Sequence, residues 1–201
     1  MLQPIPAGFS RPVFESQSTF RVTLQAMSRP GRPVRMPVTA AGPADWSGCM
    51  AALVLTLCDM DTPLWLAPGA DAPEALRFLR FHCGSPVVAS PSDAAFAVVP
   101  EGATLPSLAD FAAGSAEYPA KSATVFLASS LALDGGPDLR ISGPGVDGAG
   151  LIPRSWLPEG FLEEWRANGL LFPRGVDVIL VGRDAIVGLP RTLKMEDRPC
   201  M

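Results

Sequence analysis

The apolar run at residues 49–58 constrains the fold more than any other segment of this chain. A helix over residues 46–58 carries apolar side chains round much of its circumference, which predicts that it is deeply buried. Asp45 is its predicted N-cap, and the inward-facing residues are Trp46, Met50, Leu53, Val54 and Leu57. An extended apolar segment at residues 63–67 follows directly. A helix packed against a sheet is therefore the expected core.

Helices and strands alternate in the first half of the chain, and strands dominate the second half. Further helices are predicted from Ser16 or Ser18 to Ser28, from residues 71–74 to His82, and over residues 105–113 and 159–168. The first of them carries an apolar stripe of Phe20, Leu24 and Met27. Strands are predicted at residues 63–67, 95–99, 123–130, 139–142, 175–181 and 185–189.

Two connections have the composition of turns. Residues 133–138 predict a hairpin-like connection, and residues 182–184 predict the turn of a final hairpin. The order of elements predicts an α/β fold, a mixed β-sheet flanked by helices. We expect a single domain over residues 1–201, in which residues 1–15 form an N-terminal arm.

Composition excludes several classes of protein. Hydrophobic residues make up 48% and charged residues 18% of the 201 residues, which excludes general disorder. The net charge of −4 argues against nucleic acid and anionic membranes as partners. The cysteines, at positions 49, 58, 83 and 200, have no metal-ligand spacing, so we expect reduced thiols and no zinc site. The N-terminus does not resemble a signal peptide, and a cytoplasmic protein is expected.

Asp59 and Asp61 stand two residues apart between the buried helix and the next strand. One interpretation is a carboxylate pair that binds Mg²⁺–phosphate or acts as a general base. The other is that Asp59 ends the helix while Asp61 forms an Asx-type turn before Thr62 and Pro63. The turn interpretation is favoured on sequence alone.

His82, the only histidine, closes the next amphipathic segment. It is a candidate acid/base or phosphonate ligand, with Arg77 and Arg80 completing an anion pocket. The alternative is a helix-terminal histidine stabilised by the helix dipole, with both arginines solvated.

The remaining candidates for anion binding are glycines and arginines. The amides of Gly143 and Gly145 can approach a phosphate, although a tight turn is the commoner role of such a phrase. Arg191 can hold a carboxylate or phosphate in its fork, or lie at a partner interface. Arg21 is a further candidate, for which an intramolecular ion pair is the default interpretation. Trp156, in a proline-rich loop, is the best candidate for a partner surface.

Several phrases in order resemble one family. They are Phe20-Arg21 with Ala26-Met-Ser-x-Pro-Gly31, Leu55-Thr-Leu-x-Asp-x-Asp-Thr-Pro-Leu-Trp-Leu66, Leu76-Arg77 with Arg80-Phe-His82, Ala95-Phe-Ala97, Leu139-x-Ile-Ser-Gly-Pro-Gly-Val146, Phe172-Pro-x-Gly-Val-Asp177 and Leu189-Pro-Arg-Thr192. Over about residues 14–196 the chain resembles the PhnH family, the H subunit of the carbon–phosphorus lyase core complex of bacterial phosphonate catabolism.

The resemblance implies a fold like the large domain of type I pyridoxal-phosphate transferases, without the cofactor. The presence of only two lysines, Lys121 and Lys194, agrees with the loss of a Schiff-base lysine. It also implies a homodimer that joins G, I and J subunits. With G and I, such a subunit supports displacement of adenine from ATP by an alkylphosphonate, which yields a ribose 1-alkylphosphonate 5-triphosphate.

The family assigns no established catalytic residue to this subunit, so the resemblance transfers no residue roles. The chain departs from the family pattern at Thr192-Leu193, where a second threonine is common. Three functions remain open. The first is an accessory subunit of the phosphonate-activating complex, with no cofactor bound by this chain. The second is a stand-alone nucleoside-phosphate transferase that uses Asp59, Asp61 and His82. The third is a purely structural dimerisation scaffold.

Overall fold

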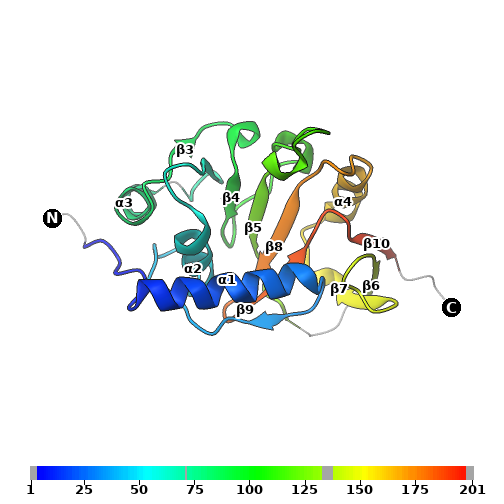
Figure 1. Cartoon of the computed structure of the whole chain (residues 1–201), viewed down its shortest axis with the longest axis horizontal. Helices are drawn as coiled ribbons and strands as arrows, with labels where there is room; N and C mark the ends of the chain where they lie inside the picture. Colours follow the sequence, from blue (N-terminus) through cyan, green and yellow to red (C-terminus); the bar gives the residue numbers. More distant parts are fainter. Residues whose placement is uncertain (1–3, 71, 133–137, 198–201) are drawn as a thin grey trace.

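The computed structural model describes residues 4–70, 72–132 and 138–197. Its centre is a seven-stranded sheet in the order β1-β9-β8-β5-β4-β2-β3 (Figure 1). The strands are β1 (Val34–Arg35), β2 (Leu64–Leu66), β3 (Val87–Val88), β4 (Phe96–Val99), β5 (Thr124–Ala128), β8 (Asp177–Val181) and β9 (Ala185–Leu189). Neighbours from β8 to β3 are parallel, whereas β9 is antiparallel to both β8 and β1. The predicted mixed sheet is confirmed, as is the final hairpin of β8 and β9.

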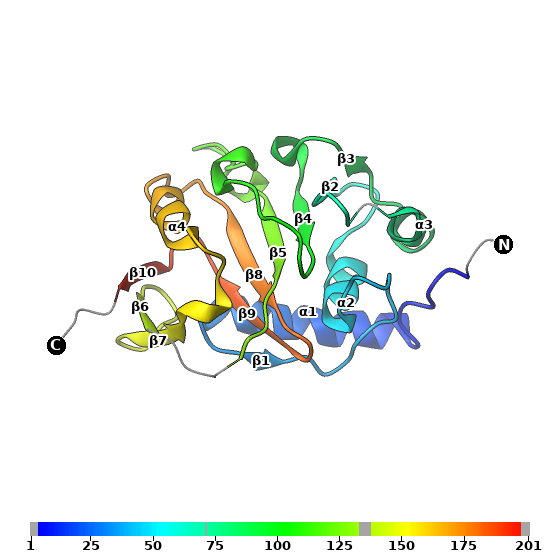
Figure 2. The ribbon, with the colours of Figure 1, turned by 180° about the vertical axis from the view of Figure 1, so that it is seen from behind.

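Both faces of this sheet are covered. The helices α1 (Pro12–Ser28), α2 (Gly48–Leu57) and α3 (Pro73–His82) pack into a core on one face, and α4 (Phe161–Gly169) packs into a core on the other. Alternate strand residues divide between the two cores, so that Val178 and Leu180 of β8 face α4 while Ile179 and Val181 face the other helices. Figure 1 shows α1 in front of the sheet. Figure 2 shows the molecule from behind, where α4 and β7 can be seen.

A second, antiparallel sheet in the order β10-β6-β7 lies beside α4. It consists of β6 (Asp138–Ser142), β7 (Gly150–Pro153) and β10 (Lys194–Asp197). The predicted hairpin between β5 and β6 is therefore wrong. Because β5 is already paired with β4 and β8 on its two edges, it has no free edge for β6. Of the predicted connection, residues 133–137 lie outside the described residues.

The deep burial predicted for the second helix is confirmed in α2. Six of its ten residues are buried: Cys49, Met50, Ala51, Ala52, Leu53 and Val54. Its N-cap is Ser47 and not Asp45, since the Ser47 hydroxyl accepts a hydrogen bond of 3.1 Å from the backbone N–H of Met50.

α1 begins earlier than predicted, so the arm is shorter than residues 1–15. Proline is favoured in the first turn of a helix, and Pro12 starts this one. The carboxylate of Glu15 accepts hydrogen bonds from the backbone N–H of Arg11 at 2.9 Å and from the Ser10 hydroxyl at 2.8 Å. These two bonds lower the pKa of Glu15 and fix the start of the helix before the serines that were predicted to cap it.

The orientation of α1 is opposite to that of an ordinary amphipathic helix. Its buried residues are Glu15, Thr19, Thr23 and Ala26, whereas Phe20 and Leu24 of the predicted apolar stripe are exposed. The cause lies at Gly188 in β9. A Cβ atom there would lie 2.4 Å from the carbonyl oxygen of Ala26, so only small side chains fit where helix and strand cross.

Two other expectations were wrong. The helix predicted over 105–113 is only a single 3-10 turn, Leu108–Asp110, whose first N–H, that of Leu108, donates to the side chain of Glu164. Trp156 is buried and its indole N–H donates to the carbonyl of Ala132 at 2.8 Å, so it forms no partner surface. Within the described part of the chain, every helix is too short or too polar to cross a membrane.

We expect Gly188→Ala to lower the free energy of unfolding by about 1–3 kcal/mol, since α1 must move away from β9 to admit the methyl group. Urea denaturation followed by circular dichroism measures this change. Gly169→Ala is the matched control, because a Cβ at Gly169 meets no atom within 4 Å. Equal stability of the two variants would show that the crossing is not tightly packed.

Candidate functional site

A cavity of about 1090 Å³ lies at the carboxyl ends of β4, β5 and β8. Its walls are the segments that follow these strands, residues 100–107, 127–130 and 181–183. The N-terminal end of α2 and the segment before α4 complete it, through residues 44–48 and 158–161. In open α/β sheets, ligands bind at the carboxyl ends of parallel strands. This position makes the cavity the candidate site.

The cavity carries more negative than positive charge. Four carboxylates line it, those of Asp45, Glu101, Glu159 and Glu164, against one guanidinium, that of Arg183. Phosphate and phosphonate groups are bound by several cations or by clustered backbone N–H groups. Here Arg183 and the N-terminal ends of α2 and α4 supply such groups, against four carboxylates. The cavity alone is therefore a poor site for a polyanion.

One carboxylate of the cavity is held in place. Oε2 of Glu164 accepts hydrogen bonds from the Ser107 hydroxyl at 2.7 Å and from the backbone N–H of Leu108 at 3.1 Å. These bonds join α4 to the segment after β4. Across the described ranges of the chain, no cluster of three or more His, Cys, Asp or Glu side chains is arranged to hold a metal ion.

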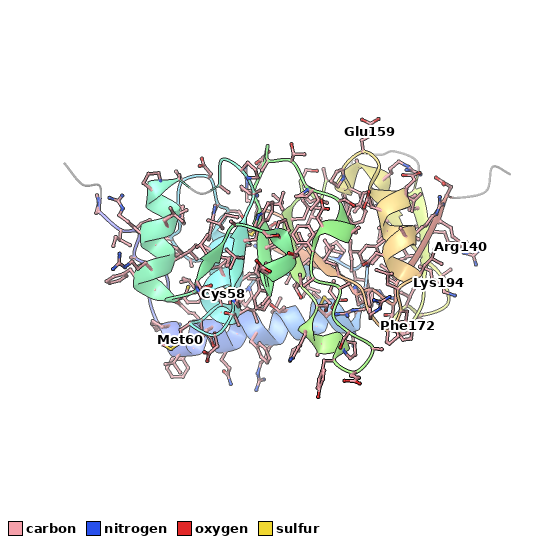
Figure 3. The ribbon with its side chains drawn as sticks, turned by 90° about the horizontal axis from the view of Figure 1, so that it is seen from above. Cys58, Met60, Arg140, Glu159, Phe172 and Lys194 are labelled. Carbon is pink, nitrogen blue, oxygen red and sulfur yellow. The ribbon has the colours of Figure 1, made fainter. Side chains whose placement is uncertain are left out.

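Asp59 and Asp61 lie at the amino ends of the parallel strands, opposite the cavity, because they precede β2, which runs parallel to β4. Figure 3 shows Met60, between them, and Glu159, at the cavity, on opposite sides of the molecule. The Asp59 carboxylate accepts hydrogen bonds from the N–H of Asp61 at 3.0 Å and from the Thr62 hydroxyl at 3.1 Å. An Asx-type turn is thus present, formed by the side chain of Asp59 and not by that of Asp61.

His82 ends α3 and contacts the N-terminal segment. Its Nε2 lies 2.9 Å from the carbonyl oxygen of Pro6, and its ring centroid lies 4.6 Å from that of Phe78. A Cβ atom at Gly8 would come within 2.9 Å of the imidazole. Within the described residues, no hydrogen bond or ion pair joins His82 to either aspartate. The histidine fastens the arm to α3, and a catalytic role for it stays a prediction.

The arginines predicted near His82 form no evident anion pocket. Arg80 is exposed, while Nε of Arg77 is buried and has no hydrogen-bond partner in the described structure. Arg21 is exposed on α1 and makes no ion pair with a described residue, so the intramolecular pair expected for it is absent. None of the three lines the cavity.

Gly143 and Gly145 are packed against other backbone segments. A Cβ at Gly143 would lie 2.8 Å from the carbonyl oxygen of Thr192, and one at Gly145 would lie 2.4 Å from that of Ser28. Both residues have positive φ angles, 130° and 83°, which favour glycine. Gly145 allows the β6–β7 connection to approach the end of α1 closely, and Gly143 allows it to approach the segment before β10.

Arg191 joins three separate segments. Its guanidinium pairs with the carboxylate of Asp177 at 2.5 Å, donates to the Pro119 carbonyl at 2.9 Å and contacts the Ser122 hydroxyl. Its backbone N–H also donates to Asp177 at 2.7 Å. Two of the phrases quoted above, Phe172–Asp177 and Leu189–Thr192, therefore meet in one largely buried ion pair. The fork predicted for an external anion is occupied by an internal carboxylate.

The described cysteines are free thiols. Burial is the main cause that raises the pKa of each: Cys49 and Cys83 to about 11, and Cys58 well above its ordinary range. The carboxylate of Asp59 adds to the increase at Cys83. Cys49 and Cys58 are buried, Cys83 is partly buried, and Cys200 lies outside the described residues.

The cavity was missed from the sequence, although a signal was present. Each predicted strand that reaches it is followed by polar or glycine residues: Glu101 and Gly102, Ser129 and Ser130, Gly182 and Arg183. Such residues at the ends of parallel strands indicate a site once the strand order is known. That order depends on long-range pairing, which residue patterns do not reveal.

Residues 7–196 match the family of bacterial phosphonate metabolism proteins called PhnH. The chain belongs to the PhnH family. The match extends from the arm into β10 and so includes both sheets and the four α-helices of the described residues. The resemblance seen in the sequence is confirmed.

Two relatives are similar to this PhnH chain over most of its length. One is the alpha-D-ribose 1-methylphosphonate 5-triphosphate synthase subunit PhnH of Rhizobium meliloti (strain 1021), 41% identical over 189 residues, which are 94% of each chain. The other is the putative C-P lyase subunit protein HtxG of Stutzerimonas stutzeri, 32% identical over 183 residues, covering 88% of this chain and 83% of the relative.

We expect Asp177→Ala to lower the free energy of unfolding by about 3–5 kcal/mol, because it leaves the Arg191 guanidinium largely buried without its counter-ion. Asp197→Ala is the control, since Asp197 pairs with Arg154 and Arg166 at the exposed surface. Its effect should stay below about 1 kcal/mol. Urea denaturation compares the two, and equal losses would contradict the role given to the Arg191 junction.

Alkylation of Cys83 by iodoacetamide should keep accelerating up to about pH 11 in the folded protein, since only the thiolate reacts and burial has raised its pKa. Between pH 8 and 10 the rate should rise about tenfold per pH unit. Peptide mass spectrometry measures the rate at this residue. In urea the rate should level off above pH 9.0, the ordinary thiol value. A plateau near pH 9 in the folded protein would contradict the expectation.

Proposed function

We propose that this PhnH chain is a subunit of the carbon–phosphorus lyase core complex of organophosphonate catabolism. In that role it supports displacement of adenine from ATP by an alkylphosphonate, which gives a ribose 1-alkylphosphonate 5-triphosphate. The observation that carries the proposal is the 41% identity over 94% of both chains to the PhnH subunit of the Rhizobium meliloti alpha-D-ribose 1-methylphosphonate 5-triphosphate synthase. The HtxG relative, a putative C-P lyase subunit, agrees with it.

The charge of the cavity favours a subunit over a stand-alone transferase. ATP and an alkylphosphonate together bring several negative charges, which four carboxylates and one guanidinium at the carboxyl edge do not balance. Cations from other chains are therefore needed if substrate approaches this edge. The alternative of a purely structural dimerisation scaffold needs no substrate contact at all.

The fold we propose by analogy is that of the large domain of type I pyridoxal-phosphate transferases, without the cofactor. The positions of the two lysines support the loss of cofactor chemistry. Lys121 lies over the ring of Tyr118, 4.8 Å from its centroid, and Lys194 begins the edge strand β10. Neither lines the cavity, so no lysine amine is available there to form a Schiff base.

The proposal includes a place and partners for the chain. We infer a cytoplasmic homodimer that assembles with G, I and J subunits. ATP and alkylphosphonate are substrates of the complex and not cofactors of this chain. The single-domain organisation over residues 1–201 is part of the same proposal.

An assay of ATP and methylphosphonate turnover, in which the release of adenine is measured, tests the proposal. We expect no turnover by the purified chain and turnover after reconstitution with G, I and J subunits. Turnover by the chain alone would favour the transferase alternative. A complex that keeps full activity when this chain is omitted would refute the proposal.

Variants in the assembled complex separate a contribution to the site from scaffolding. Arg183→Ala, which removes the guanidinium of the cavity, should lower kcat/KM at least about tenfold if substrate reaches it. Arg174→Ala, exposed and outside the cavity, is the control. His82→Ala and Asp61→Ala test the residues predicted from sequence. Full activity in all of these variants, with assembly intact, would leave the scaffold role.

A further inference from the structure

We propose that the outward face of α1 is the docking surface for a different protein chain, whose contacting surface is both apolar and acidic. We call this face the α1 surface and define it by Val13, Phe14, Phe20, Arg21 and Leu24. The proposal deepens the function proposed above, on which it rests. It says where a partner subunit binds.

The apolar part of the α1 surface is large. The exposed fractions are 78% for Val13, 67% for Phe14, 46% for Phe20 and 54% for Leu24. At 3.6 residues per turn, Val13, Phe20 and Leu24 lie within about 40° of one another round the helix, so they form one stripe. Scattered exposed apolar residues are ordinary, but a continuous stripe on one element marks an interaction site.

The opposite face of α1 makes this exposure more telling. The residues turned toward the protein include a carboxylic acid and two hydroxyls, those of Glu15, Thr19 and Thr23. The Thr19 hydroxyl is buried and has no hydrogen-bond partner in the described structure. On its inner face this helix bears the desolvation cost of buried polar groups. On its outer face two phenylalanines stay in water and gain no hydrophobic stabilisation. Burial of the outer face by another chain recovers that loss.

Charge identifies the kind of chain. Residues 1–36 contain five of the sixteen cationic residues, Arg11, Arg21, Arg29, Arg32 and Arg35, but one of the twenty acidic residues, Glu15. This segment therefore carries +4 in a chain whose net charge is −4. None of the five arginines forms an ion pair among the described residues. An acidic surface is the complement of this arrangement.

Two other occupants fit less well. In a two-fold pairing of α1 with its copy, two segments that each carry +4 over residues 1–36 would be brought together, and like charges would repel. The proposed homodimer therefore uses another surface. A basic amphipathic helix can also lie on an anionic membrane, but the net charge of −4 opposes approach of the whole protein to such a bilayer.

The test is binding of the full-length chain to a complex of the G, I and J subunits, measured by calorimetry at several salt concentrations. The double variant Phe20→Ser with Leu24→Ser should bind at least about tenfold more weakly, since central apolar residues dominate interfaces. Arg21→Glu should also weaken binding and reduce its dependence on salt. Both sites are exposed, so thermal melts should match those of the unmodified chain.

Matched controls lie outside α1. Leu170→Ser removes a side chain that is 87% exposed, and Arg174→Glu reverses an exposed charge there. Neither should change the affinity more than about twofold. If all four variants bind like the unmodified chain, the proposal is wrong although the proposed function stands. If the unmodified chain does not bind the subunits, the proposed function fails and the docking proposal with it.

Two further outcomes would overturn the proposal in favour of another occupant. The first is a shift from dimer to monomer in the α1 variants by light scattering, with subunit binding unchanged. The second is binding of the unmodified chain to vesicles of phosphatidylserine and phosphatidylcholine that the α1 variants lose, again with subunit binding unchanged.

Discussion

The close crossing of α1 over β9 is the constraint on which the rest of the structure depends. Gly188 and Ala26 allow the two backbones to approach, and the N–H of Gly31 then donates to the carbonyl of Gly188 at 3.1 Å. Because the contact face of α1 must be small, its large apolar side chains are left on the other side. The same approach brings the end of α1 against Gly145 and so locates the small sheet.

The residues of the family phrases and the residues that line the candidate site lie in different parts of the molecule. Residues of the family phrases stabilise turns and contacts between segments. Asp59 closes a turn, Gly145 allows a close approach to the end of α1, and Arg191 with Asp177 joins three segments. The cavity at the carboxyl ends of the strands is lined by other residues, with Arg183 as its guanidinium. A motif can therefore identify this family through its architecture and reveal little about its chemistry.

Much of the main sheet was predictable, because apolar runs such as residues 123–130 and 175–181 specify buried strands locally. The strand order, the second sheet and the cavity were not, since β5 pairs with β8 about fifty residues later along the chain. The outward turn of Phe20 and Leu24 was equally hidden. Periodicity indicates an apolar stripe, but not whether it faces the chain's own core or another protein.

The strand order has a consequence for how the chain is made. α1 is synthesised before β9, the strand that it crosses, which begins at residue 185. One edge of β5 also stays unpaired until β8 has been synthesised. Until residues 177–189 leave the ribosome, the nascent chain exposes an unpaired edge of β5 and the part of α1 that β9 later covers. The main sheet can therefore be completed only after residue 189 has been synthesised, and a chain cut short before residue 177 keeps an unpaired strand edge.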